Sequence, residues 1–433
     1  MHAQKVIKGF GVDDKFRDGR LSWPRLERWD TVRRFFQKLR YVHLADLLSV
    51  FLLLAAIPYA AHLRRRRPHI WLICERRMEA RDNGYWLFKY LCNQEPQVDA
   101  VYVIDRSSPD FGKVARLGKE TIPWGGVKHW AYYLAAENNI SSQKDGKPNA
   151  ALCYLLEVYG IRQNRRVFLQ HGIVHNDNIF LHYENTKMGL FVCGAKPEYD
   201  FVKNAFGYPE GSVKYLGLAR FDGLYGFRQE NIVLVMPTWR KTIATPAHFS
   251  KRLDSETEFK GTSYYRHWHA LLSDERLKDE LRCRGCRLVF YPHPNMQRFL
   301  EIFREDCDGV EFCDWRSSDM QDLLRRAAFL ITDYSSVAMD FAYMGKPLLY
   351  YQFDLDDFRQ HQYTKGYFDY GLDGFGPVCS TQDEVRETIE KWMVRQRNED
   401  LYIVRGQRFF ELHDQYNCRR NFEAIRDWGE DGD

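Results

Sequence analysis

The sequence lacks the short motifs that identify several common enzyme classes. Its 433 residues contain no G-x-x-x-x-G-K-[ST], no G-x-S-x-G and no H-E-x-x-H pattern. These absences argue against a P-loop enzyme, an α/β-hydrolase and a zinc metalloprotease, because each chemistry needs those residues at that spacing. Glycine and proline are not enriched, at 29 and 15 residues, and 45% of the chain is hydrophobic. A collagen-like or wholly disordered chain is therefore excluded.

Cysteine is present but scattered. Most of the ten cysteines sit inside apolar runs, as Cys74 does. This is typical of reduced, buried cysteines, whereas secreted disulfide scaffolds are short and rich in cysteine. Cys283 and Cys286 have C-x-x-C spacing, but Cys307 and Cys313 follow them irregularly. We expect core or loop cysteines here rather than a zinc site, which needs four ligands.

The first 40 residues also lack the apolar run of a cleavable secretory signal. The apolar run comes later, at 47–61, and is shorter than the roughly 20 residues that span a bilayer as a helix. Residues 1–70 carry 15 Lys and Arg against 6 Asp and Glu, whereas the rest of the chain is mildly acidic. This charge distribution favours an anionic membrane surface over nucleic acid as a partner.

We therefore expect residues 1–68 to form a basic, membrane-associating segment. Positive flanks on both sides of the apolar run suit a segment that lies on, or dips into, the cytoplasmic leaflet. This predicts a peripheral or monotopic protein at the cytoplasmic face of the inner (plasma) membrane. A helix buried against the body and a true membrane span are the alternatives.

From residue 69 onward, short apolar runs alternate with longer helix-like segments. The runs are continuously apolar, which is typical of strands buried on both faces of a parallel sheet. The first half has runs at 69–75, 98–105, 150–154, 166–171 and 189–194, and the second at 231–237, 286–292, 310–315, 327–333 and 347–353. The helix-like segments include 80–92, 126–139, 263–282, 318–328 and most of 382–428. The alternation predicts an α/β fold with doubly wound sheets.

The change from one half to the other falls near the polar, glycine-containing stretch 221–230. We divide the body into two Rossmann-like domains, at 69–225 and 226–400, and a helical tail at 401–433. In doubly wound sheets, ligands bind beyond the carboxyl ends of the strands, so the residues that follow each apolar run are the candidates for function.

One strand end of the second half carries two serines. Ser335 and Ser336 follow Thr332 and Asp333 and open a helical stretch, where hydroxyls and free backbone N–H groups can hold a phosphate. Asp340 lies about one turn into that helix, within reach of a nucleotide's ribose. We predict that these five residues bind substrate. A plain serine helix cap with a solvated aspartate is the alternative.

Two other strand ends of the second half carry a histidine and two cations. His293 lies between two prolines, which constrain the imidazole direction, so it could donate to a phosphate or neutralise a leaving group. Arg240 and Lys241 follow the run 231–237, and an arginine fork suits phosphate. A structural histidine and a solvated charge pair are the alternatives.

The first half contributes His171 at the end of its run 166–171. Gly172 follows it and lets a ligand approach the backbone closely. If the strand ends of the two halves face each other, His171 is the natural general base for an acceptor hydroxyl. His175 and Asp177 lie in the same loop, and either could orient His171 or replace it.

Taken in order, these elements resemble the CDP-glycerol glycerophosphotransferase family, the polyol-phosphate transferases of teichoic-acid and capsule synthesis. The matching segments are Glu75 with 80–84, then 170–172, 216–222, 237–240, 263–264 with Trp268, 293–294, and the run from 332 through Asp340 to 347. The resemblance implies a two-domain, glycosyltransferase-B-like fold. One departure bears on the acceptor: many members follow the histidine and glycine with Thr-Pro, whereas this chain has Ile173 and Val174.

The resemblance also implies a reaction. The second half would bind a CDP-polyol, with Arg240, His293 and the two serines on the diphosphate and Asp340 on the ribose. His171 would deprotonate a hydroxyl of a lipid-linked glycan or polymer, which would attack the polyol-bearing phosphorus and release CMP. Side chains and helix ends would neutralise charge, so no metal or other cofactor is expected. Glycerol phosphate is expected ahead of ribitol phosphate.

Two other functions stay open. The first is a nucleotide-sugar enzyme of the same architecture, a glycosyltransferase or an epimerase, which donor selectivity would distinguish. The second is a catalytically silent membrane scaffold of polymer assembly, in which substitution of His171 or His293 would change nothing.

Overall fold

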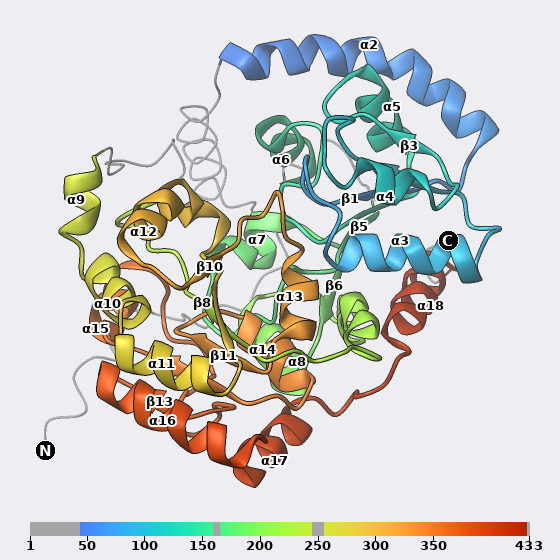
Figure 1. Ribbon diagram of the computed structural model, residues 1–433. Helices are drawn as coiled ribbons and strands as arrows, with labels where there is room; N and C mark the ends of the chain where they lie inside the picture. Colours follow the sequence, from blue (N-terminus) through green and yellow to red (C-terminus); the bar gives the residue numbers. More distant parts are fainter. Residues whose placement is uncertain (1–43, 159–164, 245–254, 431–433) are drawn as a thin grey trace, which may run out of the picture. The chain divides into compact units, whose positions relative to one another are not determined.

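A computed structural model describes residues 44–158, 165–244 and 255–430 of the chain (Figure 1). Most of the expected basic N-terminal segment, residues 1–43, lies outside the described residues. Residues 45–433 form one compact unit. This unit contains two sheets, of seven and six strands, in which the described strand pairs are all parallel.

The first sheet uses the first half of the body and the second sheet uses the rest. The strands of the first are β1 (Trp71–Cys74), β2 (Ala100–Val103), β3 (Thr121–Ile122), β4 (Asn138–Ser141), β5 (Arg165–Phe168), β6 (Leu190–Cys193) and β7 (Val213–Tyr215). Those of the second are β8 (Ile232–Met236), β9 (Arg287–Phe290), β10 (Glu311–Phe312), β11 (Phe329–Thr332), β12 (Leu348–Tyr351) and β13 (Val378–Cys379).

Both sheets have the same topology. Their orders are β3-β2-β1-β4-β5-β6-β7 and β10-β9-β8-β11-β12-β13, so each starts at an inner strand, winds outward, returns and winds the other way. The direction of winding changes between β1 and β4 and again between β8 and β11. In such sheets, the crevice at the carboxyl ends of those strands is where ligands bind. The predicted α/β fold with two doubly wound sheets is confirmed.

Side chains alternate between two buried faces along each central strand. In β1, Trp71 and Ile73 join one apolar core, while Leu72 and Cys74 join another on the opposite face. β8 divides in the same way between two further cores. Helices cover both faces of each sheet, which explains why these strands read as continuous apolar runs.

The helices follow the strands in an alternating order. Those before β8 are α2 (Leu44–Arg66), α3 (Asn83–Gln94), α4 (Phe111–Ala115), α5 (Val127–Ala135), α6 (Ala150–Val158), η1 (Ile179–Leu181), α7 (Tyr183–Thr186), α8 (Lys196–Ala205) and η2 (Ala219–Leu224). Those after it are α9 (Glu256–Lys260), α10 (Ser263–Leu272), α11 (Glu275–Cys283), η3 (Pro294–Phe299), α12 (Leu300–Asp306), α13 (Met320–Arg326), α14 (Val337–Tyr343), α15 (Leu355–His361), α16 (Gln382–Arg395), α17 (Asp400–Phe409) and α18 (Asn417–Glu430).

One segment prediction was wrong, and another extended too far. The run 150–154 belongs to helix α6, where the Asn149 side chain accepts a hydrogen bond from the Leu152 N–H at 2.8 Å and caps the first turn. The segment 126–139 contains the expected helix, α5, but its last two residues already belong to strand β4, which we did not expect. β4 is polar in sequence but fully buried between β1 and β5, so its burial was not visible in its composition.

Helix α2 contains the apolar run 47–61 and packs by one face only. Ala56, Ala60 and Leu63 are buried in the core beneath it, whereas Leu48 and Phe51 are 62% and 68% exposed. Within α2, Asp46–Arg66 is long and apolar enough to cross a membrane by length and composition alone. Burial against the body, which was one of the alternatives, therefore holds for one side of this helix, and the other side stays apolar and uncovered.

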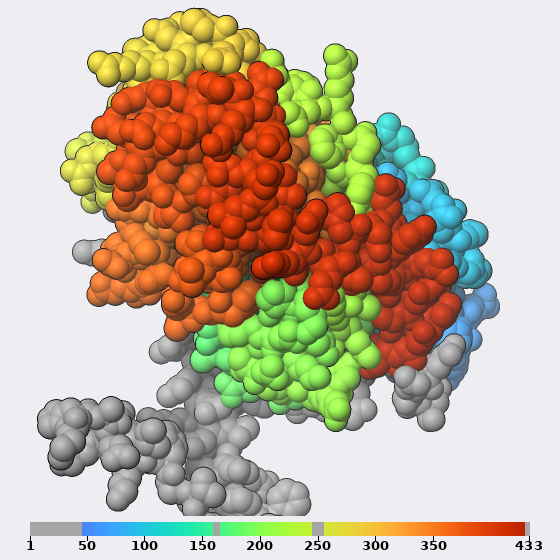
Figure 2. Space-filling model, turned by 90° about the horizontal axis from the view of Figure 1, so that it is seen from below, coloured from blue at the N-terminus to red at the C-terminus, as the bar shows by residue number. Residues whose placement is uncertain are grey.

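The C-terminal helix returns to the first half. Phe422 and Ile425 of α18 pack into the core that contains Trp71 of β1. Asp222 fixes the start of α18, because its carboxylate accepts hydrogen bonds from the backbone N–H groups of Asn417 and Cys418 at 3.0 and 2.8 Å. Figure 2 shows these last residues, in red, crossing the face of the molecule between the two halves.

Candidate active site

A cavity of about 160 Å³ lies at the carboxyl ends of the strands and is lined by both halves. The first half supplies Glu75, Arg76, Glu79, Arg81, Asp82, Gln143, His171 and Arg220, and the second supplies Tyr291, His293, Pro294, Trp315, Met320, Gln321, Leu324, Ser335, Ser336, Val337 and Asp340. These residues follow β1, β4, β5, β7, β9, β10 and β11 in the chain. The cavity therefore lies where the topology of both sheets predicts a ligand site.

His171 reaches this cavity because the backbone turns sharply after β5. Gln170 has a φ of +63°, a left-handed conformation that costs a non-glycine residue energy. Its buried side chain donates to the Val192 carbonyl and, at 3.0 Å, to Glu198, while Asn83 donates to its carbonyl at 2.8 Å. These hydrogen bonds hold the turn that carries the imidazole of His171.

Gly172 brings the two halves into contact beside His171. A Cβ at this position would lie 2.6 Å from the Ser336 hydroxyl, so any larger residue would force the Ser336 side chain to move. Ser335 and Ser336 line the same cavity and come from the start of α14. The structure thus brings together the predicted base of the first half and the predicted phosphate-binding serines of the second.

The protonation of His171 is set by the cleft. The residue is accessible from the cleft. Desolvation by the surrounding protein lowers the pKa of His171, and the nearby carboxylate of Asp82 raises that pKa. The cations Arg76 and Arg220 lower the pKa further. The net effect is a pKa below the ordinary histidine value. His171 is therefore neutral at physiological pH and able to accept a proton.

His293 is also neutral but is arranged as a donor. Desolvation and the charges of Arg76 and His171 lower its pKa. Its Nδ1 accepts a hydrogen bond from the Asn295 N–H at 3.2 Å, so the proton of the neutral ring resides on Nε2. Of the two roles considered for His293, donation to a phosphoryl oxygen fits this state, whereas neutralisation by a charged imidazolium does not.

Asp340 lines the cavity but is not free. Arg220 donates to its two carboxylate oxygens at 2.7 and 2.8 Å and to Asp82 at 2.9 Å. Asp340 comes from the second half and Asp82 from the first, so one buried guanidinium joins both halves at the floor of the cavity. A contact from Asp340 to a ribose stays a prediction and requires a hydroxyl to share this carboxylate.

Four predicted substrate-binding residues do not line the cavity. Asp333 is fully buried and accepts from the Thr238 and Tyr334 N–H groups and from Arg240. Thr332 donates to the Met236 carbonyl at 2.7 Å. Arg240 also pairs with Asp354 at 2.9 Å, and Lys241 donates to the Gln362 carbonyl. These four hold the loops after β8 and β11, and direct substrate contact stays a prediction for each.

The two alternatives to His171 lie elsewhere. His175 is buried, with its ring nitrogens 3.2 Å from the Ile173 carbonyl and the Tyr370 hydroxyl. Asp177 pairs with His182 at 2.8 Å. Neither lines the cavity, so of these three candidates only His171 is placed to meet a ligand there.

Two residues at the end of β1 also line the cavity: Glu75, which the family resemblance included without a role, and Arg76, which our sequence reasoning missed. Glu75 is buried in the cavity wall and accepts from the Tyr85 N–H at 2.8 Å, and burial raises its pKa to about 7. Arg76, the next residue, also lines the cavity. The signal was available, because Glu75 ends the predicted strand 69–75 and Arg76 follows it directly, as the chosen residues follow theirs.

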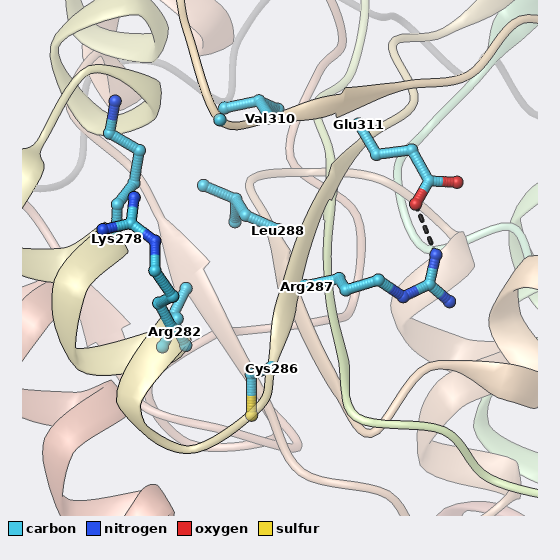
Figure 3. A pocket seen from close by; sticks show the side chains of 9 residues that line it. Lys278, Arg282, Cys286, Arg287, Leu288, Val310 and Glu311 are labelled. Carbon is cyan, nitrogen blue, oxygen red and sulfur yellow. Dashed lines mark hydrogen bonds and ion pairs between the residues drawn. The ribbon is translucent and has the colours of Figure 1, made fainter.

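A second cavity of the described chain lies within the second half. A cavity of about 340 Å³ lies between α11 and the edge of the second sheet, but its cations are paired, as Figure 3 shows for Arg287 and Glu311. Cys286 lines this cavity, whereas Cys283, Cys307 and Cys313, the other cysteines considered for a zinc site, do not. Across the three described ranges, no group of three or more His, Cys, Asp or Glu could hold a metal ion.

A family model described as CDP-Glycerol:Poly(glycerophosphate) glycerophosphotransferase matches residues 56–426. The chain belongs to this family. The match includes both sheets and every residue that lines the cavity. The predicted resemblance to the glycerophosphotransferase family is confirmed.

Curated relatives match this chain over part of their own length. The minor teichoic acid biosynthesis protein GgaB of Bacillus subtilis is 34% identical over 366 residues, which cover 83% of this chain and 40% of GgaB. A teichoic acid poly(glycerol phosphate) polymerase of Bacillus spizizenii is 27% identical over 175 residues, 40% of this chain and 39% of that protein. The chain thus spans about two fifths of the length of these curated relatives.

A solved structure of the wall teichoic acid polymerase TagF has the same fold. It superposes with a TM-score of 0.63 over 93% of this chain and 99% of that chain, at 14% sequence identity. At that identity, the similarity concerns architecture alone, and it agrees with the expected glycosyltransferase-B-like arrangement of two sheets.

Proposed function

We propose that this protein transfers a polyol phosphate from a CDP-polyol to a hydroxyl of a cell-wall polymer and releases CMP. One observation carries the proposal: in a member of the glycerophosphotransferase family, His171 and the pair Ser335 and Ser336 line one cavity at the carboxyl ends of both sheets. A base and a phosphate-binding segment are the two parts that such a transfer needs.

In this reaction the donor lies against the second half. Ser335, Ser336 and the Nε2–H of His293 donate to the diphosphate. A TagF variant soaked with CDPG has a related fold, with a TM-score of 0.60 and 15% identity, which is consistent with a CDP-polyol donor. Relatives named for glycerol phosphate and for ribitol phosphate both match this chain. We take CDP-glycerol as the first donor to test because the family model is described for it.

His171 acts as the general base. It accepts the proton of the acceptor hydroxyl, and the oxygen attacks the polyol-bearing phosphorus from the side of the first half. A new O–P bond forms, the bond from that phosphorus to the bridging oxygen breaks, and CMP leaves as a monophosphate. The lowered pKa of His171 supports this role, because a neutral imidazole is available when the acceptor arrives.

The acceptor, in this proposal, is attached to a membrane lipid. The uncovered apolar face of α2, with Leu48 and Phe51, and the basic flank Arg64, Arg65 and Arg66 favour association with the inner face of an anionic membrane. Attachment there brings the cleft to the surface where lipid-linked chains lie.

The experiment measures CMP release from CDP-glycerol and CDP-ribitol by detergent-purified protein, with a lipid-linked oligomer as acceptor, with and without EDTA. We expect release that survives EDTA and falls by roughly a hundredfold or more in His171→Ala, since a general base contributes about that much. The matched control is His175→Ala, a nearby histidine outside the cavity.

Other outcomes would redirect the assignment. Turnover of a CMP- or UDP-sugar in place of either CDP-polyol would identify a glycosyltransferase. Failure of every donor, with His171→Ala leaving polymer assembly in cells unchanged, would indicate a scaffold. Loss of CMP release in EDTA, restored by a divalent cation, would contradict the expectation that side chains alone neutralise the charge.

A further inference from the structure

We propose that Arg76 is a phosphate-binding residue of this cleft. It was not among the residues expected to bind substrate, and it comes from the first half, opposite the serines that are expected to hold the donor. The inference rests on the proposed transfer reaction. It adds a cation of the first half that binds a phosphate group of the donor or of the acceptor.

Three arginines line the cavity, and two of them are committed to the protein. Arg220 is 4% exposed and is held by the carboxylates of Asp82 and Asp340. Arg81 is 13% exposed, pairs with Asp110 at 2.7 Å, and also donates to two backbone carbonyls of the second half. Neither guanidinium can turn toward a ligand without leaving buried carboxylates unpaired, which is costly.

Arg76 is the third arginine, and its guanidinium is largely uncommitted. Its hydrogen bond within the described chain joins Nη1 to Glu79 at 3.4 Å, a long contact between residues three apart. The side chain is 41% exposed although it lines the cavity. A loosely paired arginine at the wall of a cleft can offer its planar fork to an anion with two parallel hydrogen bonds.

Arg76 also lies near the reacting groups. It follows Glu75 directly at the end of β1, beside the point where the first sheet changes its direction of winding. Its positive charge acts on both His171 and His293 and helps to lower the pKa of each. An anion held by Arg76 would therefore lie in the same cavity as the proposed base and the proposed donor to the phosphoryl oxygens.

The chemistry that fits is a phosphate group. Arg220 and Arg81 are already paired with carboxylates, so Arg76 is the cavity arginine that is left to pair with an added anion. A diphosphate or a phosphodiester brings one or two negative charges that need a cation as charge moves in the transition state. Two sources supply such a group: the diphosphate of the donor and the phosphate nearest the acceptor hydroxyl.

The test compares Arg76→Gln and Arg76→Lys with the wild type and with Arg77→Gln. Arg77 is the adjacent arginine, is 64% exposed, pairs with Asp105 and does not line the cavity, so it is the matched control. For Arg76→Gln we expect kcat/KM to fall roughly ten- to a hundredfold, the cost of losing a charged hydrogen bond. Arg76→Lys should recover part of the loss, and Arg77→Gln should behave as the wild type.

Two arms identify the source of the phosphate. Calorimetry with CDP-glycerol alone reports the donor, and weaker binding to Arg76→Gln would assign Arg76 to the diphosphate. Unchanged donor binding with a raised KM for a glycerol-phosphate oligomer, but not for a phosphate-free acceptor, would assign it to the acceptor. The thermal unfolding midpoint of each variant should match the wild type, because Arg76 is exposed and weakly paired.

The two proposals fail separately. If the wild type turns over a CDP-polyol and Arg76→Gln matches Arg77→Gln in both arms, the role of Arg76 is wrong while the transferase stands. If the wild type turns over no CDP-polyol, the transferase proposal fails. In that case, calorimetry with CDP-glycerol tests the role of Arg76 by itself. Weaker binding to Arg76→Gln than to the wild type supports the role. Equal binding to the two proteins, or no binding to either, overturns it.

Discussion

A histidine can take a proton from an acceptor hydroxyl only while its ring is neutral. His171 meets this condition because desolvation by the protein and the cations Arg76 and Arg220 lower its pKa, against the opposing charge of Asp82. The protonated, inactive form therefore accumulates only below the ordinary value of about 6.5. Neighbouring charges, and not the histidine alone, set the pH range in which the base works.

We predict that the acid limb of the kcat/KM profile, which reports groups of the free enzyme, has its midpoint below pH 6.5. Activity should be present above the lowered pKa of His171 and be lost as the pH falls through it. Arg76→Gln removes a positive charge and should move this midpoint to higher pH, as measured by CMP release between pH 4.5 and 8. If the midpoint of the acid limb does not change in Arg76→Gln, the charge of Arg76 does not influence the pKa of His171.

The backbone at Gln170 supports a second prediction. Its left-handed φ favours glycine, but its side chain holds Glu198 and the Val192 carbonyl. Both Gln170→Gly and Gln170→Ala lose the side-chain contacts. Glycine adopts the left-handed backbone conformation without strain, whereas alanine remains strained in it. We therefore expect Gln170→Ala to be less stable than Gln170→Gly by roughly 1 kcal/mol in urea unfolding.

Both Gln170 variants should also lower kcat, because the turn that carries His171 loosens. An alanine variant that is as stable as the glycine variant would mean that the turn relaxes to another conformation. Gln396 has a similar φ of +53° at the end of α16, far along the chain from the cavity residues, and Gln396→Gly serves as the control for a general effect.

At the scale of a single element, α2 combines a buried face with an apolar uncovered face. Ala56 and Ala60 anchor it to the core below β1, so its attachment does not depend on Leu48 or Phe51. A helix whose exposed residues were chosen only for solubility would carry charge there. Its exposed side is therefore the part to alter when membrane association is tested.

We predict that Leu48→Glu with Phe51→Glu weakens binding of the full chain to vesicles containing phosphatidylglycerol. Each exposed side chain that inserts contributes roughly 1.5 kcal/mol or more, so partitioning should fall at least tenfold. Leu401→Glu, at a 54% exposed position of α17, is the control. Equal sedimentation of the double variant and the control with the vesicles would remove α2 from the membrane proposal.

At the scale of the whole molecule, the two halves are joined by polar contacts across the cleft. Arg220 bridges carboxylates of both halves, Arg81 donates to the Trp315 and Ser318 carbonyls, and Trp86 donates to Gln321 at 2.7 Å. These contacts fix the separation of the base from the serines. The active geometry is thus a property of the two halves together.

We predict that Arg220→Ala lowers the free energy of unfolding by roughly 3–5 kcal/mol, because it leaves the carboxylates of Asp82 and Asp340 buried without their cation. Adding Asp340→Asn should recover part of that loss, since one uncompensated charge is removed. A urea-unfolding double-mutant cycle measures the coupling. If the two substitutions change the free energy of unfolding by strictly additive amounts, Arg220 and Asp340 do not stabilise each other.

Family membership, the two-sheet fold and the positions of His171, His293 and the two serines could be predicted from the sequence. Parallel strands buried on both faces leave continuous apolar runs, and the residues that follow them fall at one edge of the sheet. Where burial does not follow composition, as in the polar strand β4, this reasoning failed. It also failed at 150–154, because a short apolar run fits a helix as well as a strand.

The sequence by itself determined which residues reach the strand ends, since alternation and chain order settle that locally. Only the tertiary structure decided which of them face a ligand. Arg240 and Arg76 both follow central strands, yet the first is buried by Asp333 and Asp354 and the second stands at the cavity wall. The physical reason is that the partner of a charge is chosen by packing between segments far apart in the chain, and no local pattern records that choice.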